Sequence, residues 1–400
     1  MKQIKEVNID DLLNRPTIKL ANDHIRAYLK NKTVLVTGAA GSIGSEIARQ
    51  VCSINPDCLI LCDQNESGLF ELEYELQQKF GAGENTKIFI GDIRDKKAMQ
   101  TLFTDYQPQV VFHAAAYKHV PMMEKHPCEA IRNNVLGTKV LADLAVKFGA
   151  ERFIFVSTDK AINPTNVMGA SKRVAEMYVQ SLQSQQFNIS VDQNGDIDLQ
   201  RLDKPEKHFT RFITTRFGNV LGSNGSVIPR FKEQISKGGP VTVTHPEIIR
   251  YFMTIPEACS LVLEAGTMGN GGEIFLFDMG EPVKIVDLAT KMIKLAGLIP
   301  GKDINIEFTG LRPGEKLYEE LLNKKEEVIP THHKKIMIAK SSKVDYDFVN
   351  VEIDKLIELG LNSKEMDVVR QMKYIVPEFK SKNSRFEQLD SEREMIESVN

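Results

Sequence analysis

The 400-residue chain has few of the features that mark secreted, disulfide-stabilised or membrane proteins. Its five cysteines are odd in number and contain no Cys-x-x-Cys pair, which argues against a disulfide framework and against a zinc site. No apolar run approaches the roughly 20 residues that cross a bilayer, and the polar N-terminus has no signal-peptide core. We therefore expect a cytoplasmic protein without a membrane span.

The chain also has little net charge. Its formal net charge is −3, with acids and bases interspersed, so nothing attracts the whole molecule to nucleic acid or to anionic lipid. Any phosphate site must therefore be local. His113, His119 and His126 lie close together in sequence, but their spacing does not put them on one helix face, and we expect no metal site.

Short runs rich in Val, Ile, Leu and Phe alternate with amphipathic stretches of helical length. The runs at 33–37, 59–63, 87–90, 110–113 and 153–157 have the composition of buried parallel strands. This alternation predicts an α/β protein with a doubly wound parallel (Rossmann) sheet and a smaller C-terminal substrate-binding α/β domain.

Composition shifts divide the chain into four parts: an N-terminal arm at 1–31, a domain with the alternating runs at 32–221, a looser region at 222–340 and a helical extension at 341–400. The motifs described below assign dinucleotide (NAD) binding to the second part and substrate binding to the third. Inside the second part, an Asn194-Gly195 step between two alternating runs predicts a hairpin in an insertion at about 184–208. The last twenty residues are charged, and we expect them to be poorly ordered.

The clearest motif follows the first predicted strand. Thr37-Gly38-Ala39-Ala40-Gly41-Ser42-Ile43-Gly44 has a glycine spacing that allows a tight turn and a close approach of backbone to a pyrophosphate at a helix N-terminus. Asp63 closes the second strand, where a carboxylate accepts hydrogen bonds from an adenosine ribose and repels a 2′-phosphate. The motif therefore predicts NAD rather than NADP, the alternative being a glycine turn without a ligand. The predicted contacts are Gly38, Ser42, Ile43, Gly44 and Asp63.

The next two strands supply further predicted cofactor contacts. Gly91-Asp92-Ile93 follows the third strand and brings Asp92 and Ile93 to the adenine edge, although Asp92 could instead cap a helix at 94–103. The small side chains of Ala114 and Ala115 follow the fourth strand and leave room for a dinucleotide.

Met168 stands where a short-chain dehydrogenase has its tyrosine acid/base. The segment Met168-Gly169-Ala170-Ser171-Lys172 keeps the lysine of a Tyr-x-x-x-Lys pair and lacks the tyrosine. A second lysine, Lys160, lies beside Asp159 in Ser157-Thr158-Asp159-Lys160 at the end of a strand. This combination indicates more than simple hydride transfer, the alternative being a surface ion pair of Asp159 and Lys160.

Six segments together resemble the UDP-N-acetylglucosamine 4,6-dehydratases of bacterial polysaccharide and glycan biosynthesis, extended members of the short-chain dehydrogenase/reductase superfamily. They are residues 37–44, 113–121, 157–160, 168–172, 216–226 and 311–316. The similarity runs from about residue 10 to residue 338. Many members carry an N-terminal transmembrane region that the printed sequence lacks, so the resemblance is to the soluble catalytic part or to a soluble, methionine-type member.

The resemblance implies that water is removed from a UDP-N-acetylhexosamine, UDP-GlcNAc first of all, to give a UDP-4-keto-6-deoxy sugar. It implies Lys160 as the base at C5, Asp159 as the acid toward the C6 oxygen and Thr158 as the group that orients the C4 hydroxyl. Lys172 would hold the nicotinamide ribose. A lysine base must lose its proton, so the pKa of Lys160 must fall well below ~10.4 through burial or the charge of Lys172. Met168 cannot accept the C4 proton, which leaves Asp159, Thr158 or water, and it resembles the version that retains configuration at C5.

A UDP-sugar also requires cations for its two phosphates. Arg250 and Arg312 are the candidates, because a guanidinium fork fits a diphosphate better than an ammonium does. Arg250 could instead form a surface salt bridge, and Asn133 could satisfy backbone groups. By resemblance, the other predicted substrate contacts are Lys118, Asn133, Asn219, Ser226, Val227, Ile228 and Glu315.

Three alternative functions stay open. A UDP-sugar 4-epimerase shares the fold and the oxidation at C4, but it needs no Asp–Lys pair to eliminate water. A C5-inverting 4,6-dehydratase differs in the face that receives the proton. A catalytically silent NAD-binding protein would explain the missing tyrosine, although the retained Thr158, Asp159, Lys160 and Lys172 argue against it. A homo-oligomer is usual in the superfamily and is expected here.

Overall fold

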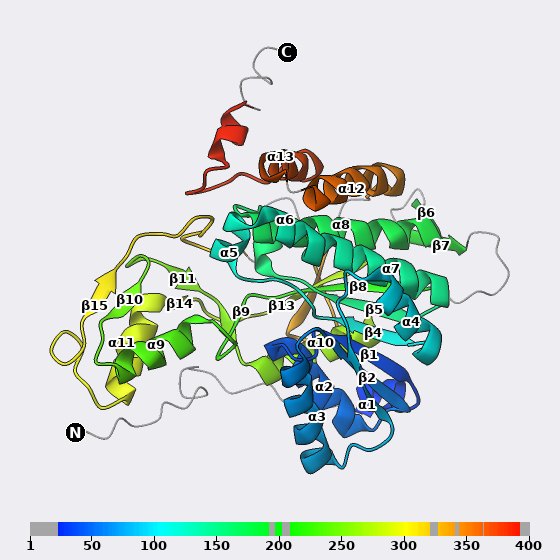
Figure 1. Ribbon diagram of the computed structural model, residues 1–400, viewed down its shortest axis with the longest axis horizontal. Coiled ribbons are helices and arrows are strands. Elements are labelled where there is room, and N and C mark those ends of the chain that lie inside the picture. Colours follow the sequence, from blue (N-terminus) through cyan, green and yellow to red (C-terminus); the bar gives the residue numbers. More distant parts are fainter. Residues whose placement is uncertain are drawn as a thin grey trace.

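A nine-stranded sheet forms the centre of the part of the chain that the structure describes (Figure 1). The structure is a computed structural model and describes residues 23–191, 197–201, 209–320, 327–340, 344–362 and 364–392. The strands have the order β16-β17-β13-β8-β5-β4-β1-β2-β3. Those in parallel pairs are β1 (Thr33–Thr37), β2 (Cys58–Asp63), β3 (Thr86–Ile90), β4 (Val110–His113), β5 (Arg152–Val156), β8 (Arg211–Arg216) and β13 (Ile274–Phe277). The antiparallel edge strands are β16 (Val328–Pro330) and β17 (Ile336–Ala339).

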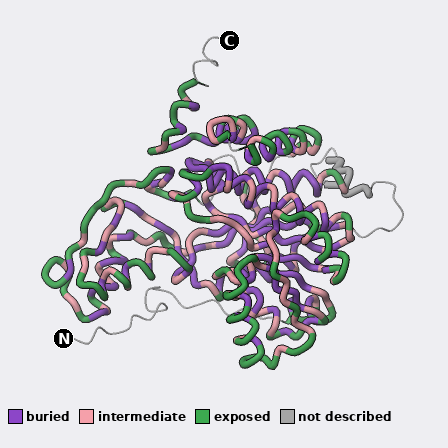
Figure 2. Tube along the Cα trace, in the orientation of Figure 1, coloured by how far each residue is buried: buried purple, intermediate pink, exposed green. Residues whose placement is uncertain are grey.

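The strand order confirms the predicted Rossmann sheet, because the chain winds outward from β1 in both directions. Helices cover both faces, and β1 shows how: Val34 and Val36 contribute to one hydrophobic cluster, and Leu35 contributes to the other. Figure 2 shows this burial as a continuous buried zone through the sheet. The helices of one face are α1 (Asp23–Leu29), α2 (Ser42–Ile54), α3 (Glu66–Phe80) and α10 (Ile255–Met268). Those of the other include α4 (Lys96–Tyr106), α7 (Gly137–Phe148) and α8 (Val167–Gln186).

Between β4 and α7 the chain forms short helical segments rather than one long helix. They are α5 (Val120–Lys125), α6 (Pro127–Ala130) and the π-helical η2 (Ile131–Leu136). A single 3₁₀ turn, η3 (Asp159–Ala161), follows β5. In the described ranges, no helix combines the length and apolar character that spanning a membrane requires.

A smaller lobe with its own hydrophobic cluster lies beside the sheet, at the left in Figure 1. Its elements are β9 (Asn219–Val220), α9 (Val227–Ser236), β10 (Val241–Val243), β11 (Ile249–Arg250), β12 (Phe252–Met253), β14 (Val283–Lys284), α11 (Ile285–Leu295) and β15 (Ile306–Phe308). After β12 the chain crosses to the large sheet domain for α10 and β13, returns to this lobe for β14, α11 and β15, and then joins the sheet again through β16 and β17. The domain boundary expected after residue 221 stays a prediction.

The insertion contains the predicted hairpin. Strands β6 (Phe187–Val191) and β7 (Ile197–Arg201) pair in antiparallel register. The Asn194-Gly195 step on which this prediction rested lies outside the described residues.

The C-terminal extension packs on the sheet domain through α12 (Tyr346–Leu361) and α13 (Glu365–Ile375). Both lie against the layer that contains α8 (Figure 1). The prediction that the last twenty residues are poorly ordered is wrong for residues 381–392. Phe386 and Leu389 are buried there, because these isolated apolar side chains reach the cluster beneath α12 and α13.

We expect the buried ion pair of Glu176 and Arg216 to be a main stabilising contact of this fold. Two guanidinium nitrogens of Arg216 lie 2.8 and 2.7 Å from the two carboxylate oxygens of Glu176, and both side chains are buried. Glu176→Gln leaves a buried charge uncompensated, so the free energy of unfolding should fall by about 3–5 kcal/mol in denaturant titrations. Asp367→Asn, which breaks the exposed pair with Arg370, is the control and should change it by about 1 kcal/mol or less. Equal effects would contradict this account.

Candidate active site

A cleft of about 380 Å³ opens where the parallel strands end, between the large sheet and the smaller lobe. Ala114, Ser157 and Phe217, which directly follow β4, β5 and β8, line its sheet side. A smaller hollow of about 140 Å³ lies at the ends of β1, β2 and β3 and shares Ala114 and its neighbours with the cleft. The two form one elongated groove at the edge where open parallel sheets bind ligands.

The glycine loop borders the smaller hollow. Gly38 has φ +69°, and a Cβ on it would lie 2.6 Å from the backbone nitrogen of Ala115. A Cβ on Gly44 would lie 2.0 Å from the carbonyl oxygen of Gly38, so the start of α2 packs directly on the turn. The Asp63 carboxylate accepts hydrogen bonds from the backbone nitrogens of Ala40 (3.0 Å) and Asn65 (2.9 Å). The backbone of the loop therefore forms a tightly packed surface, and Asp63 lies at its edge.

The other predicted cofactor residues are distributed between the smaller hollow and the cleft. Asp92, Ile93, Ala114 and Ala115 line the smaller one, and Ile43 lines the cleft. The Ser42 hydroxyl accepts a hydrogen bond from the backbone nitrogen of Asn224 and so joins the glycine loop to the smaller lobe.

The proposed capping role of Asp92 is wrong, because Asp95 caps α4. Asp92 instead forms an ion pair with Arg94, with a shortest N–O distance of 2.6 Å. Burial acts to raise the pKa of Asp92, but its hydrogen bonds with Arg94 outweigh burial and lower it.

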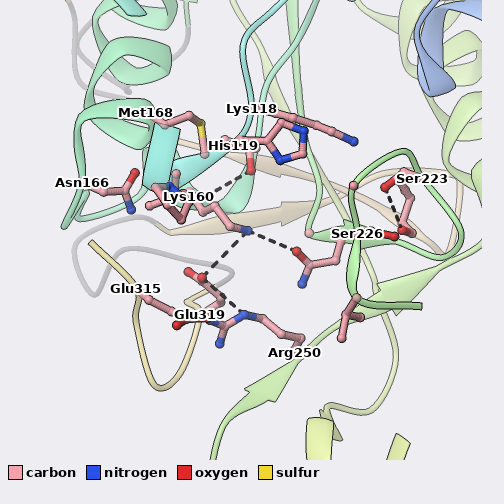
Figure 3. Close-up of a pocket in the computed structure, with 18 of the residues that line it drawn as sticks. Lys118, His119, Lys160, Asn166, Met168, Ser223, Ser226, Arg250, Glu315 and Glu319 are labelled. Carbon is pink, nitrogen blue, oxygen red and sulfur yellow. Dashed lines mark hydrogen bonds and ion pairs between the residues drawn. The ribbon is translucent and has the colours of Figure 1, made fainter. Parts of the chain in front are cut away.

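Asp159 and Lys160 lie inside the molecule, so they do not form a surface ion pair. The Lys160 Nζ lies 2.9 Å from Asp159 Oδ1, and the Thr158 hydroxyl donates to the same oxygen at 2.8 Å. Asp159 is 1% exposed, and its Oδ2 has no hydrogen-bond partner in the described part of the chain. Lys160 also reaches Asn219 Oδ1 at 3.4 Å (Figure 3). Thr158 and Lys160 therefore line the cleft, and the buried carboxylate of Asp159 contacts both of them from behind.

The N-terminus of α8 lies directly against this cluster. A Cβ on Gly169 would lie 2.1 Å from the carbonyl oxygen of Lys160, so only glycine allows the approach. The contact brings Met168 and Lys172 to the cleft, where both side chains are buried. The Lys172 Nζ lies 3.9 Å from the centroid of the Phe155 ring.

The structure reverses the predicted protonation behaviour of the two lysines. Burial acts to lower the pKa of Lys160, but the carboxylates of Asp159 and Glu319 outweigh burial and raise it above its ordinary value. The expectation of a lowered value for Lys160 in the free protein is therefore wrong. Burial lowers the pKa of Lys172 to about 7, against the opposing effect of Glu176.

Arg250 and Arg312 differ in their exposure and in the contacts that their side chains make within the protein. Arg250 is buried, donates to the carbonyls of Lys316 and Leu317, and lies within 3.7 Å of Glu315 and Glu319 oxygens, which excludes a surface salt bridge. The Arg312 side chain is 48% exposed at the mouth of the cleft and pairs with Glu315 at 3.0 Å. Of the two, Arg312 is the more accessible to a ligand.

Most of the remaining predicted substrate residues line the cleft. They are Lys118, Asn219, Ser226, Val227 and Glu315. Asn133 lies in the smaller hollow and donates to Asn134 Oδ1 at 3.1 Å, so it does not line the larger cleft. Ile228 lies in the core of the smaller lobe.

Sequence reasoning missed several residues of the cleft. Glu319 is the most important, and it lies four positions beyond Glu315, just outside the segment that had been singled out. His119 was considered only as a metal ligand, whereas its ring packs against Gly225. Across the described ranges, no group of His, Cys, Asp and Glu side chains is placed to hold a metal ion.

Known proteins with similar sequences belong to polysaccharide biosynthesis. The polysaccharide biosynthesis protein family matches residues 34–341. The capsular polysaccharide biosynthesis protein CapD of Staphylococcus aureus is 48% identical over 91% of this chain and 56% of its own length, so the chain spans about half of that relative. A UDP-glucose 4-epimerase of Rickettsia rickettsii is 32% identical over 74% of this chain and 79% of its own length.

Solved structures show the same fold. The X-ray structure of Pen from Bacillus thuringiensis has a TM-score of 0.68 and 30% identity and covers 82% of this chain and 99% of its own. DesIV, a dTDP-glucose 4,6-dehydratase from Streptomyces venezuelae with NAD and TYD bound, has a TM-score of 0.58 and 20% identity and covers 73% and 89%. With the family match, these comparisons show that the chain belongs to the polysaccharide biosynthesis protein family, within the extended short-chain dehydrogenase/reductase superfamily.

Proposed function

We propose that this chain catalyses the NAD-dependent 4,6-dehydration of a UDP-N-acetylhexosamine, with UDP-GlcNAc as the first candidate and retention at C5. The product would be a UDP-4-keto-6-deoxy sugar for bacterial polysaccharide or glycan biosynthesis. One observation carries the proposal: the buried carboxylate of Asp159 pairs with Lys160, which lines the cleft beside the Thr158 hydroxyl. Elimination of water requires an acid and a base on one sugar ring, and this pair supplies both.

The residues of the smaller hollow fit NAD. Because Gly38 and Gly44 have no Cβ atoms, a pyrophosphate can approach the backbone closely at the start of α2. Asp63 at the rim suits an adenosine ribose, and Lys172 on the cleft side suits the nicotinamide ribose. When bound, NAD would take a hydride from C4 of the sugar and return it at C6.

The start of α9 fits the diphosphate of a UDP-sugar. Ser226 occupies the N-cap position of α9 without a capping hydrogen bond, and its buried Oγ has no hydrogen-bond partner within the described ranges. Arg312 and Lys118 line the same cleft. A helix N-terminus with a hydroxyl donor and two nearby cations is a suitable site for an anion.

The contacts of Asp159 support a path for the C4 hydroxyl proton in the absence of a tyrosine. The Thr158 hydroxyl already donates to Asp159, so it can pass the C4 proton to that carboxylate. Met168 takes no part in this proton transfer. Asp159, once protonated, is the acid for the departing C6 oxygen, and Lys160 is the base for the C5 proton.

A UDP-sugar 4-epimerase is the second candidate, because the Rickettsia relative carries that description at 32% identity. The buried Asp159–Lys160 pair favours the dehydratase, because epimerisation removes no water.

Incubation with UDP-GlcNAc, without added reductant, should give a sugar nucleotide lighter by one water. The reaction is redox-neutral, so the protein with its bound cofactor needs no external electron source. Mass spectrometry makes the measurement. An unchanged mass with a new chromatographic peak would support the epimerase instead, and an unaltered substrate would count against both enzymes for this sugar.

Lys160→Ala should slow deuterium uptake at C5 from heavy water by at least about 100-fold, because it removes the base that touches C5. NMR of the product measures the uptake, and bound NAD should stay at the wild-type level. Lys355→Ala, at an exposed lysine on α12, is the control and should behave as wild type. Uptake at the normal rate in Lys160→Ala would rule out Lys160 as the base.

Arg312→Ala should weaken binding of UDP, measured by calorimetry, by about tenfold through loss of a charge-assisted contact. Binding of NAD should change by less than about twofold, since Arg312 lines the cleft and not the smaller hollow. Lys302→Ala, at an exposed lysine of the smaller lobe, tests for a general effect of lost charge. Equal losses for UDP and NAD would contradict a diphosphate role.

A further inference from the structure

Glu319 contributes a second buried carboxylate to the cluster around Lys160. Its side chain is 3% exposed, and its Oε1 lies 3.8 Å from the Nζ of Lys160 and 3.7 Å from the Nε of Arg250. Its other oxygen, Oε2, has no hydrogen-bond partner in the part of the chain that the structure describes. Figure 3 shows Glu319 between Lys160 and Arg250. A buried carboxylate oxygen without a donor is costly, so it calls for an explanation.

The proposed reaction leaves one proton without a destination. In the free protein the two neighbouring carboxylates hold the pKa of Lys160 above its ordinary value, so this lysine starts as an ammonium. It must lose a proton before it can act as a base at C5. Asp159 cannot take that proton, because in the proposed reaction it already receives one from the C4 hydroxyl through Thr158.

We propose that Glu319 accepts the proton of Lys160 during each turnover and returns it afterwards. The inference rests on the proposed function. It requires a carboxylate that is close to Nζ, shielded from water and not fully occupied by donors. In Glu319, Oε1 lies 3.8 Å from the Nζ of Lys160, and Oε2 is the buried oxygen that has no donor among the described residues. Because Glu319 acts through Lys160, it is a positioning residue for the proton and does not touch the sugar.

The proton balance of the reaction then closes. The C4 hydroxyl proton passes through Thr158 to Asp159 and leaves with the C6 oxygen as water. Neutral Lys160 takes the C5 proton, the electrons of that C–H bond form the C5–C6 double bond, and the C6–O bond breaks. The hydride taken from C4 is added at C6, and Lys160 returns a proton to C5 on the same face. Glu319 finally gives its stored proton back to Lys160, so all side chains end as they began.

The charged residues around Glu319 support its role as a temporary acceptor of the Lys160 proton. Arg250 lies beside Glu315 and Glu319 and balances part of their charge. Lys316, also buried, donates to the carbonyl of Ile162. Burial lowers the pKa of Lys316, and nearby carboxylates, led by that of Glu319, oppose the shift. The cluster therefore contains cations that can compensate the carboxylates while a proton moves between Glu319 and Lys160.

The test is the rate of C5 deuterium uptake by Glu319→Gln as a function of pH, with UDP-GlcNAc as substrate. We expect uptake near pH 7 to fall by about 100-fold, because the amide cannot accept the proton. The rate should recover as pH rises, because Lys160 then loses its proton to solvent. A purely electrostatic role gives the opposite sign: without the negative charge the pKa of Lys160 falls, so uptake near pH 7 stays equal or increases. That result would overturn the proposal.

Two further variants separate proton storage from a structural effect. Glu319→Asp keeps a carboxylate and should retain more uptake than Glu319→Gln. Glu320→Gln changes the adjacent glutamate, whose side chain is 46% exposed, and should behave as wild type. Calorimetric binding of UDP should stay within about twofold in all three variants; a Glu319→Asp variant no better than Glu319→Gln, with UDP binding lost, would count against the proposal. If the unmodified protein takes up no deuterium and forms no dehydrated product, the proposed function fails, irrespective of Glu319.

Discussion

Asp159 and Lys160, in the η3 turn after β5, share one network of charges with Arg250 and Glu319. Charges inside a protein are tolerated only when they are paired, so this network ties the sheet to the loops that cover it. The same contacts hold a buried carboxylate directly behind the lysine and the hydroxyl group that line the cleft. The contact between the sheet and these loops and the proposed catalysis therefore depend on the same side chains.

Close backbone contacts hold that network in position. Gly169 lets the start of α8 approach Lys160, and the C-terminal extension supports the same region from outside. The backbone nitrogen of Lys382 donates to the carbonyl of Thr165, and the carbonyl of Lys382 accepts from the nitrogen of Gly314, next to Arg312 and Glu315. A segment beyond the family match at 34–341 thus joins the loop before α8 to the loop that carries Arg312.

The comparisons and the site contribute different information. The family match and the solved structures establish a Rossmann fold and the polysaccharide biosynthesis protein family, and the similar proteins include a UDP-glucose 4-epimerase and a dTDP-glucose 4,6-dehydratase. The distinction between these reactions lies in the side chains around C5 and C6 of the sugar. The buried Asp159–Lys160 pair, together with Glu319, is the feature that favours elimination of water.

The sequence by itself determined the sheet, the glycine loop and the cluster at 157–160, because strand periodicity, turn chemistry and adjacent residues are local properties. It also predicted the hairpin at β6 and β7. Only the tertiary structure decided the protonation of the two lysines, the burial of Arg250 and the place of Glu319 in the cleft. The physical reason is that a pKa depends on burial and on charges within a few ångströms, and folding brings those groups together from distant parts of the chain.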